Sequence, residues 1–210
     1  LRGTPIVAIH GTHERRSKHL INPVQALEHT GHLLHLHCET AVFDIAGKKV
    51  AVHGMSGVPE RYAKECLVGW HPRPVQSAVN ILMLHQSIDP YIYSPLGPPS
   101  LKLEDLPSGF DLYVLGHMHW HEARRFKSGM LLLPGSTVPT SLHQQEAEQE
   151  KGYYVYDTEP RFVPLQSQRK VFLREFTLGP STEREIEQAL QGIADLKLAK
   201  KPIVLFKLKG

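Results

Sequence analysis

The sequence has few cysteines, no long apolar run and no strong charge imbalance, and each of these features argues against a class of protein. The two cysteines, Cys38 and Cys66, lie far apart in the chain, which argues against a zinc knuckle and favours two buried cytosolic thiols over a disulfide. No stretch approaches the roughly 20 apolar residues that a membrane helix needs. No charged segment followed by an apolar one opens the chain as a secretory signal would. We therefore expect a cytoplasmic protein with no membrane partner.

The charge of the chain is nearly balanced, and histidine is the residue type in excess. A formal net charge of +3 does not by itself indicate nucleic-acid binding, but it permits a basic face that includes Arg15, Arg16 and Lys18. The length of 210 residues suits one full domain with a small appendage, and 41% hydrophobic residues can form an ordinary core. The 14 histidines cluster at the ends of apolar runs, which indicates a site built from imidazoles.

Alternating apolar runs and amphipathic segments predict an α/β fold. Strands are expected at residues 5–9, 41–45, 48–53, 79–85, 111–115, 130–133 and 153–156, and helices at residues 22–29 and 59–70. Ala46 and Gly47 lie between two of these strands and predict a tight hairpin. Strands and helices in this order favour a layered α/β sandwich.

The pattern changes near residue 161, where a small second domain is expected. Apolar and polar residues alternate over residues 171–178 and 203–208, and these strands bracket a helix that should begin at Thr182. Thr182 and Glu185 have the spacing of a capping box. The polar run at residues 144–150 is expected to be a solvated loop or helix.

Three apolar strands end on loops that carry histidine, and these loops carry the chemistry. The loops contain His13, His85, and the pair His117 and His119 in a Gly-His-x-His segment. Polar groups at the carboxyl ends of neighbouring strands converge on one crevice, and neutral imidazole suits divalent transition metals. Two metals roughly 3.5–4 Å apart could clamp the attacking and leaving oxygens of a phosphodiester. His53, alone at its strand end, is expected to be structural instead.

These segments resemble the calcineurin-like metallophosphoesterases and, within them, the meiotic recombination eleven (SbcD-type) nucleases of DNA double-strand-break repair, in their archaeal form. The resemblance covers most of the chain and rests on residues 9–14, 84–86, 116–119 and 134–142, the last with a Pro-Gly-Ser-x-x-x-Thr-Ser pattern. It implies an α/β fold, a layered β-sandwich flanked by helices, over residues 1–160. It also implies a small α+β capping domain, in part, that contacts DNA at residues 161–210.

The resemblance also implies roles for single residues. His85 and His117 would bind one metal and His119 the other, while His13 would contact the scissile phosphate and assist the leaving oxygen. Thr12 stands where the family has a metal-binding Asn, so it either ligates directly or holds a bridging water. Basic residues are the candidates for DNA contact: Arg15, Arg16, Lys18, Arg169 and Lys170.

Cofactors and partners follow from the same resemblance. It implies two Mn²⁺ ions, with Mg²⁺ as the alternative, and hydrolysis of DNA by a metal-activated water, as exonuclease or endonuclease. The expected partners are DNA, an SMC-like coiled-coil repair ATPase (SbcC-type) and a second copy in a homodimer. The expected location is cytoplasmic and nucleoid-associated, or nuclear in a eukaryote.

Two motifs of the family are missing from this sequence. Neither an Asp-x-His nor a Gly-Asp, which would supply the bridging carboxylate, occurs in the 210 residues. We therefore expect an N-terminally truncated chain that lacks its first metal-binding strands, binds metal weakly or not at all and is inactive alone. Two alternatives stay open: another calcineurin-like phosphatase or phosphodiesterase, and a non-catalytic module that binds DNA or a protein partner.

Overall fold

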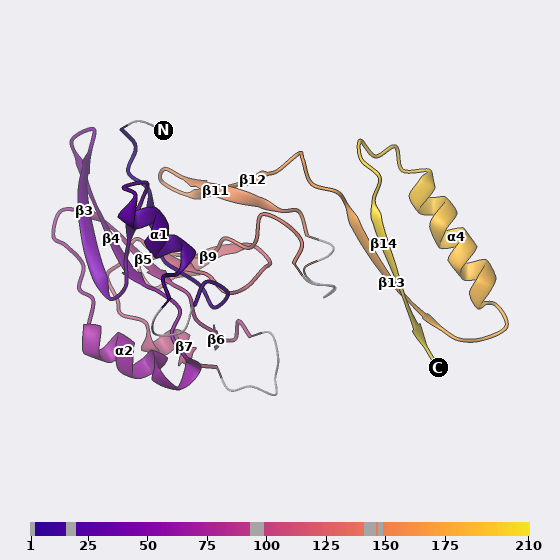
Figure 1. The fold of residues 1–210 in the computed structure, drawn as a ribbon, viewed down its shortest axis with the longest axis horizontal. Coiled ribbons are helices and arrows are strands. Elements are labelled where there is room, and N and C mark those ends of the chain that lie inside the picture. The colour runs from indigo at the N-terminus through magenta and orange to yellow at the C-terminus, as the bar shows by residue number, and fades with distance from the viewer. Residues whose placement is uncertain (1–2, 16–19, 93–98, 141–145, 147–148) are drawn as a thin grey trace. The chain divides into compact units, whose positions relative to one another are not determined.

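The computed structural model describes residues 3–15, 20–92, 99–140, 146 and 149–210 (Figure 1). The chain divides into two compact units. The first holds Leu1–Gly135 and Tyr156–Pro160, and the second holds Ser136–Val155 and Arg161–Gly210. Both strands and helices are present, so the mixed α/β class expected from the sequence is confirmed. Over the described residues, no helix combines the length and the apolar character needed to cross a membrane.

A six-stranded mixed sheet forms the centre of the first unit. In spatial order its strands are β3 (Glu39–Ile45), β4 (Lys48–Met55), β5 (Val79–Leu84), β8 (Leu112–Leu115), β10 (Gly129–Leu133) and β9 (Glu122–Phe126). The four inner strands are parallel, and the edge strands β3 and β9 are antiparallel to their neighbours. The hairpin predicted between β3 and β4 is confirmed, with positive φ angles of 51° at Ala46 and 78° at Gly47.

The register of the inner strands brings their carboxyl ends to one edge of the sheet. Met55 at the end of β4 pairs with Leu84 at the end of β5, and Leu84 pairs in turn with Leu115 at the end of β8. The neighbouring pair Leu132 and Val114 aligns β10 in the same way. The loops that follow these four strands therefore emerge side by side.

Part of the core packs between this sheet and a helical segment. A short 3₁₀ turn (Glu60–Tyr62) leads into α2 (Ala63–Trp70), so the helix expected at residues 59–70 has a tighter first turn than predicted. Ala63 and Leu67 of α2 are buried in the same cluster as Leu82 and Leu84 of β5. Burial of these side chains contributes roughly 25 cal/mol per Å² of apolar surface, and it packs α2 against β5.

Short elements complete the first unit. Strand β1 (Val7–Ala8) pairs in parallel with β2 (Leu34–His35), and α1 (Pro23–His29) lies between them in the chain. Asn22 caps α1, and the side chain of Gln25 closes a reciprocal capping box. Further along the chain come β6 (Ile88–Asp89), β7 (Leu101–Lys102) and a 3₁₀ turn at Leu103–Asp105.

Two small two-stranded sheets lie mostly in the second unit, although Tyr156 and Pro160, at the ends of one of them, belong to the first. Strand β11 (Gly152–Tyr156) pairs with β12 (Pro160–Pro164). Strand β13 (Val171–Thr177) pairs in parallel with β14 (Ile203–Lys209), and α4 (Thr182–Ala194) connects them. The strand–helix–strand tail predicted from the sequence is confirmed, whereas the DNA-contacting role of residues 161–210 stays a prediction.

The predicted capping box at Thr182 is wrong. Ser181 is the N-cap of α4, and its side chain makes no capping bond to the helix backbone. Thr182 is already the first helical residue, and its hydroxyl accepts from the Gly179 amide and donates to the Thr177 carbonyl. The Thr182 side chain therefore ties the helix to the preceding turn instead of capping it.

His53 is a structural histidine, as expected for an isolated strand end. Its ring is buried, with Nδ1 2.8 Å from the Thr40 hydroxyl and Nε2 3.2 Å from Asn80 Oδ1. Asn80 Nδ2 donates to the carbonyls of Val75 and Ala78, so Asn80 Oδ1 must face His53 as an acceptor. Nε2 of His53 therefore carries a proton, and burial, which lowers the pKa of His53, favours the neutral ring.

This network predicts acid sensitivity. Burial lowers the pKa of His53, and its bond to Asn80 only partly opposes the shift. The unfolded chain takes up a proton below about pH 6.5, while folded His53 resists protonation, so stability is full above this pH and is lost as the pH falls. Urea unfolding at pH 7.5 and 5.5 should show this loss, and His53→Gln should reduce it. The control, His29→Gln, changes an exposed histidine; an unchanged pH dependence in His53→Gln would contradict the assignment.

Candidate functional site

Two of the predicted site histidines meet at the carboxyl edge of the central sheet. His85 follows β5 directly, and Gly116 and His117 follow β8. The Gly116 amide donates to the Leu84 carbonyl over 2.8 Å, which continues the sheet past the strand ends. The centroids of the His85 and His117 rings lie 5.4 Å apart. The sheet register thus brings together side chains that are far apart in sequence.

Glycines let the surrounding loops approach His85 closely. A Cβ at Gly11 would lie 2.6 Å from His85 Cε1, and a Cβ at Gly116 would lie 2.8 Å from His85 Nδ1. The loop after β1 is held in place because the Gly57 amide donates to the His10 carbonyl over 2.8 Å. A side chain at Gly11 or Gly116 would displace the imidazole, so both positions require glycine for packing.

Burial keeps these imidazoles neutral. It lowers the pKa of His85 to about 4, with a further contribution from His117, while Glu14 acts in the opposite direction. Burial also lowers the pKa of His117, against the charge of Glu60. A neutral imidazole has a free lone pair, which is the form that binds a metal.

The backbone at His117 is strained. Its φ angle is 85°, a left-handed conformation that is unfavourable for any residue other than glycine. Such strain costs of the order of 1–3 kcal/mol and is found mainly at functional sites. The surrounding packing holds the His117 ring in an orientation that an unconstrained loop would not adopt.

The remaining predicted site residues lie around this pair. The charges of His13 and His119 contribute to the lowered pKa of His117, after burial, so both lie near it. His119 is half-buried, whereas Thr12 and His13 are exposed. Within the described ranges, no three His, Cys, Asp or Glu side chains are grouped closely enough to hold a metal. The ligand roles of His119 and Thr12 stay predictions.

The candidates for DNA contact are distributed over both units. Arg15 is half-buried in the first unit, and Arg169 and Lys170 are exposed in the second. Arg16 and Lys18 lie outside the described residues.

A histidine relay that the sequence reasoning missed fixes the loop after β1. His10 Nδ1 lies 3.0 Å from His35 Nε2, which is also 2.9 Å from the Ser56 hydroxyl. Ser56 accepts from the His10 amide, and Glu28 accepts from the His35 amide. The relay links β2 to the loops after β1 and β4. The position of His10 directly before Gly11 was the one sequence signal that could have indicated it.

A buried ion pair, also missed, supports the loop after β10. The carboxylate of Glu146 lies 3.3 Å from the Lys151 ammonium, and these side chains are 1% and 3% exposed. The Thr140 amide and hydroxyl donate to Glu146, and Lys151 donates to the Ser136 hydroxyl over 3.0 Å. The expectation of a solvated segment at residues 144–150 is therefore wrong at Glu146.

This pair stabilises the Pro-Gly-Ser-x-x-x-Thr-Ser segment at its described residues 134–140; Ser141 and Leu142 lie outside them. Gly135, at the start of the segment, packs on the backbone that follows His119. A Cβ there would lie 3.1 Å from the His121 amide nitrogen and 3.2 Å from the His119 carbonyl oxygen. The segment thus begins against the histidine loop and ends in the Glu146 network.

Removing one partner of the ion pair should destabilise the protein strongly. Glu146→Gln leaves the Lys151 charge buried without its carboxylate, which typically costs about 3–5 kcal/mol, and Lys151→Met should have a similar cost. The double variant should recover much of the loss because neither charge remains. Urea unfolding measures all three, with Glu150→Gln at an exposed position as the control. Single variants as stable as the parent would refute the role assigned to the pair.

Comparisons with known proteins find relatives of one kind. No family model matches the chain. It is 27% identical over 214 residues to the DNA double-strand break repair protein Mre11 of Methanopyrus kandleri, covering 90% of this chain and 46% of the relative. The protein of the same name from Methanocaldococcus jannaschii is 33% identical over 136 residues, 61% of this chain and 35% of the relative.

A eukaryotic relative shows the same similarity. The double-strand break repair protein MRE11 of Encephalitozoon cuniculi is 30% identical over 213 residues, covering 91% of this chain and 36% of the relative. The chain thus spans less than half the length of these curated relatives. With the histidine loops at the carboxyl edge of a mixed α/β sheet, the chain belongs to the Mre11/SbcD-type family of the metallophosphoesterase superfamily.

Proposed function

We propose that this chain forms the histidine-bearing part of a metal-dependent nuclease that acts on DNA double-strand breaks. The observation that carries the proposal is the meeting of His85 and His117 at the carboxyl edge of the parallel strands, 5.4 Å apart. Relatives named as double-strand break repair proteins align over most of the chain. Ligand sites in open α/β sheets lie at this edge.

The donor set fits part of a two-metal site. His85 and His117 would hold one Mn²⁺ or Mg²⁺ ion and His119 the second, with Thr12 ligating directly or through water. Imidazole nitrogen suits Mn²⁺ better than Mg²⁺, which prefers oxygen ligands. Glu14 already accepts from the Gly11 amide over 2.8 Å, so it is a poor candidate for a bridging carboxylate. We propose that carboxylates of an Asp-x-His and a Gly-Asp motif, absent from these 210 residues, complete the site.

The chain's own residues position and protonate the substrate. A bound divalent metal would polarise the phosphodiester and lower the pKa of an attacking water. His13 is exposed beside the buried pair, where it can contact the scissile phosphate and donate a proton to the leaving oxygen. The relay from His10 to His35 holds the loop that carries His13. These groups supply orientation and proton transfer.

The rest of the chain fits a layered sandwich with a DNA-contacting cap. The central sheet would form one layer, and the paired β1 and β2 would belong to a second. The β13–α4–β14 unit would contact DNA as a capping domain. Exonuclease or endonuclease action, an SMC-like ATPase partner, a homodimer and a cytoplasmic, nucleoid-associated or nuclear location follow from this proposal.

A non-catalytic binding module is the second candidate. It is favoured by one observation, that no three acidic, histidine or cysteine side chains of the described segments form a metal-sized group. Such a module would bind DNA with the same affinity whether or not a divalent metal is present.

Substitution of His13 separates catalysis from metal binding. In a longer protein that also carries the two acidic motifs, His13→Asn should reduce the rate of DNA cleavage by about 10²–10⁴-fold, because general acid assistance is lost. Metal content, measured by elemental analysis, should stay at the parental level. Loss of metal from the variant would show that His13 is a ligand and that its assigned role is wrong.

The 210-residue chain should bind Mn²⁺ weakly and cleave no DNA, since neutral imidazoles do not offset the repulsion between two cations. Calorimetric titration should show that this weak binding is reduced further in Gly116→Ala, where a Cβ would lie 2.8 Å from His85 Nδ1. Gly69→Ala is the matched control, because no heavy atom lies within 4 Å of its added Cβ. Equal Mn²⁺ binding by both variants would place the metal away from His85.

A further inference from the structure

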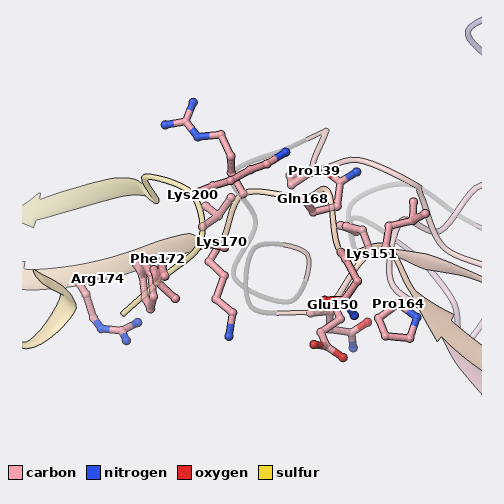
Figure 2. Close-up of a pocket in the computed structure, with 16 residues that line it drawn as sticks. Pro139, Glu150, Lys151, Pro164, Gln168, Lys170, Phe172, Arg174 and Lys200 are labelled. Atoms are coloured by element: carbon pink, nitrogen blue, oxygen red, sulfur yellow. The ribbon is translucent and has the colours of Figure 1, made fainter. Parts of the chain in front are cut away.

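A pocket of about 440 Å³ lies in the second unit, between the start of β13 and the segments around β11 and β12 (Figure 2). Its volume is in the range of pockets that hold a small organic ligand, about 300–1,000 Å³. The residues that line it include five basic side chains and one acidic one: Lys151, Arg169, Lys170, Arg174, Lys200 and Glu150. Lining of this composition favours an anionic ligand.

Three of the five basic side chains, Arg169, Lys170 and Lys200, have no acidic partner among the residues that the structure describes. Lys151 is neutralised by the buried Glu146. Arg169 donates to the carbonyls of Lys201 and Pro202, and Lys200 donates to the Ser167 carbonyl. These acceptors are neutral, so both cations keep their full charge. In the part of the chain that the structure describes, the Lys170 ammonium has no acidic partner.

Other basic residues of the tail differ in this respect. Lys207 and Lys209 both pair with Glu175, so their charges are partly balanced. The pocket thus offers a phosphate group cations that are not balanced by a described carboxylate, as Lys207 and Lys209 are.

Aromatic and planar groups lie beside these cations. Lys170 directly precedes β13, and Phe172 and Arg174 lie in it at the next two alternate positions, where side chains face the same side of an extended chain. Figure 2 shows Lys170 and Arg174 extending to the same side. The Arg174 guanidinium lies over the Phe172 ring, 5.8 Å from its centroid. Nucleobases stack on aromatic rings and on guanidinium planes. The Lys170 ammonium and the Phe172 ring, which could bind a phosphate and a base, are therefore two residues apart in the chain.

The remaining lining suits a nucleobase. Three amide side chains, Gln149, Gln166 and Gln168, can donate to and accept from a base edge, and Pro139 and Pro164 add apolar surface. We propose that this pocket binds one nucleotide of single-stranded DNA, with its phosphate on Lys170 and its base on the Phe172–Arg174 stack. The inference rests on the proposed function only in taking DNA as the polynucleotide.

Binding of fluorescently labelled oligonucleotides tests the proposal. Anisotropy titrations of the 210-residue chain would use a single-stranded oligonucleotide and a blunt duplex. Phe172→Leu should weaken single-strand binding about tenfold, as loss of one stacked base does, and Phe172→Tyr should restore it. Lys170→Gln should lower the slope of log K against log salt by about 0.7. Lys197→Gln, which removes an exposed charge outside the pocket, should leave affinity within about twofold of the parent.

Competition by free deoxyadenosine monophosphate shows whether the pocket binds a free nucleotide or only a nucleotide within a DNA strand. If the free nucleotide displaces the single strand from the parent but not from Phe172→Leu, the pocket accepts a nucleotide alone. If it displaces nothing but single-strand binding still depends on Phe172, the pocket accepts a nucleotide only within a strand. Both results support the proposal. Single-strand binding unchanged in Phe172→Leu and Lys170→Gln overturns it. If the parent still binds the duplex in that case, the proposed function stands, whereas binding to neither DNA contradicts both.

Discussion

The in-register pairing of β4, β5, β8 and β10 is the constraint on which the candidate site depends. Because Met55, Leu84 and Leu115 align across three strands, the loops that follow emerge at one edge of the sheet. His85 and His117 come within 5.4 Å between ring centroids as a result. A shift of one residue in the pairing of β5 or β8 would move all of that strand's side chains to the opposite face of the sheet. Such a shift in β5 is unfavourable because it would remove Leu82 and Leu84 from the core, where both are buried.

Around this edge, close packing and a strained backbone fix the positions of the His85 and His117 rings. Gly11 and Gly116 leave room that any larger residue would occupy, and burial holds His85 neutral. The left-handed backbone of His117 is retained because neighbouring loops determine its position. The Glu146–Lys151 pair extends this support, since it stabilises the segment that begins on the backbone after His119. The site is thus held by groups that have no direct chemical role in it.

Much of the fold could be predicted from the sequence because local patterns determine it. The Ala46-Gly47 turn, the apolar run of β5 and the alternation in β13 and β14 each indicated the right element. Local spacing failed at Thr182, where the hydroxyl bonds to the preceding turn rather than to the helix. It failed again at Glu146, whose polar surroundings in sequence conceal a buried partner at Lys151. The His10–His35 contact joins residues 25 positions apart, which no local pattern reveals.

The central claim is that a divalent metal binds at His85 and His117, and paramagnetic NMR tests it most directly. In protein with ¹⁵N-labelled histidine, substoichiometric Mn²⁺ should broaden the ring signals of His85 and His117 first. His119 and His13 should follow, and the structural residue His53, which pairs with Leu82 three positions before His85 on the neighbouring strand, should broaden later than all four. Broadening that begins at other histidines, or equally at His53, would contradict the account.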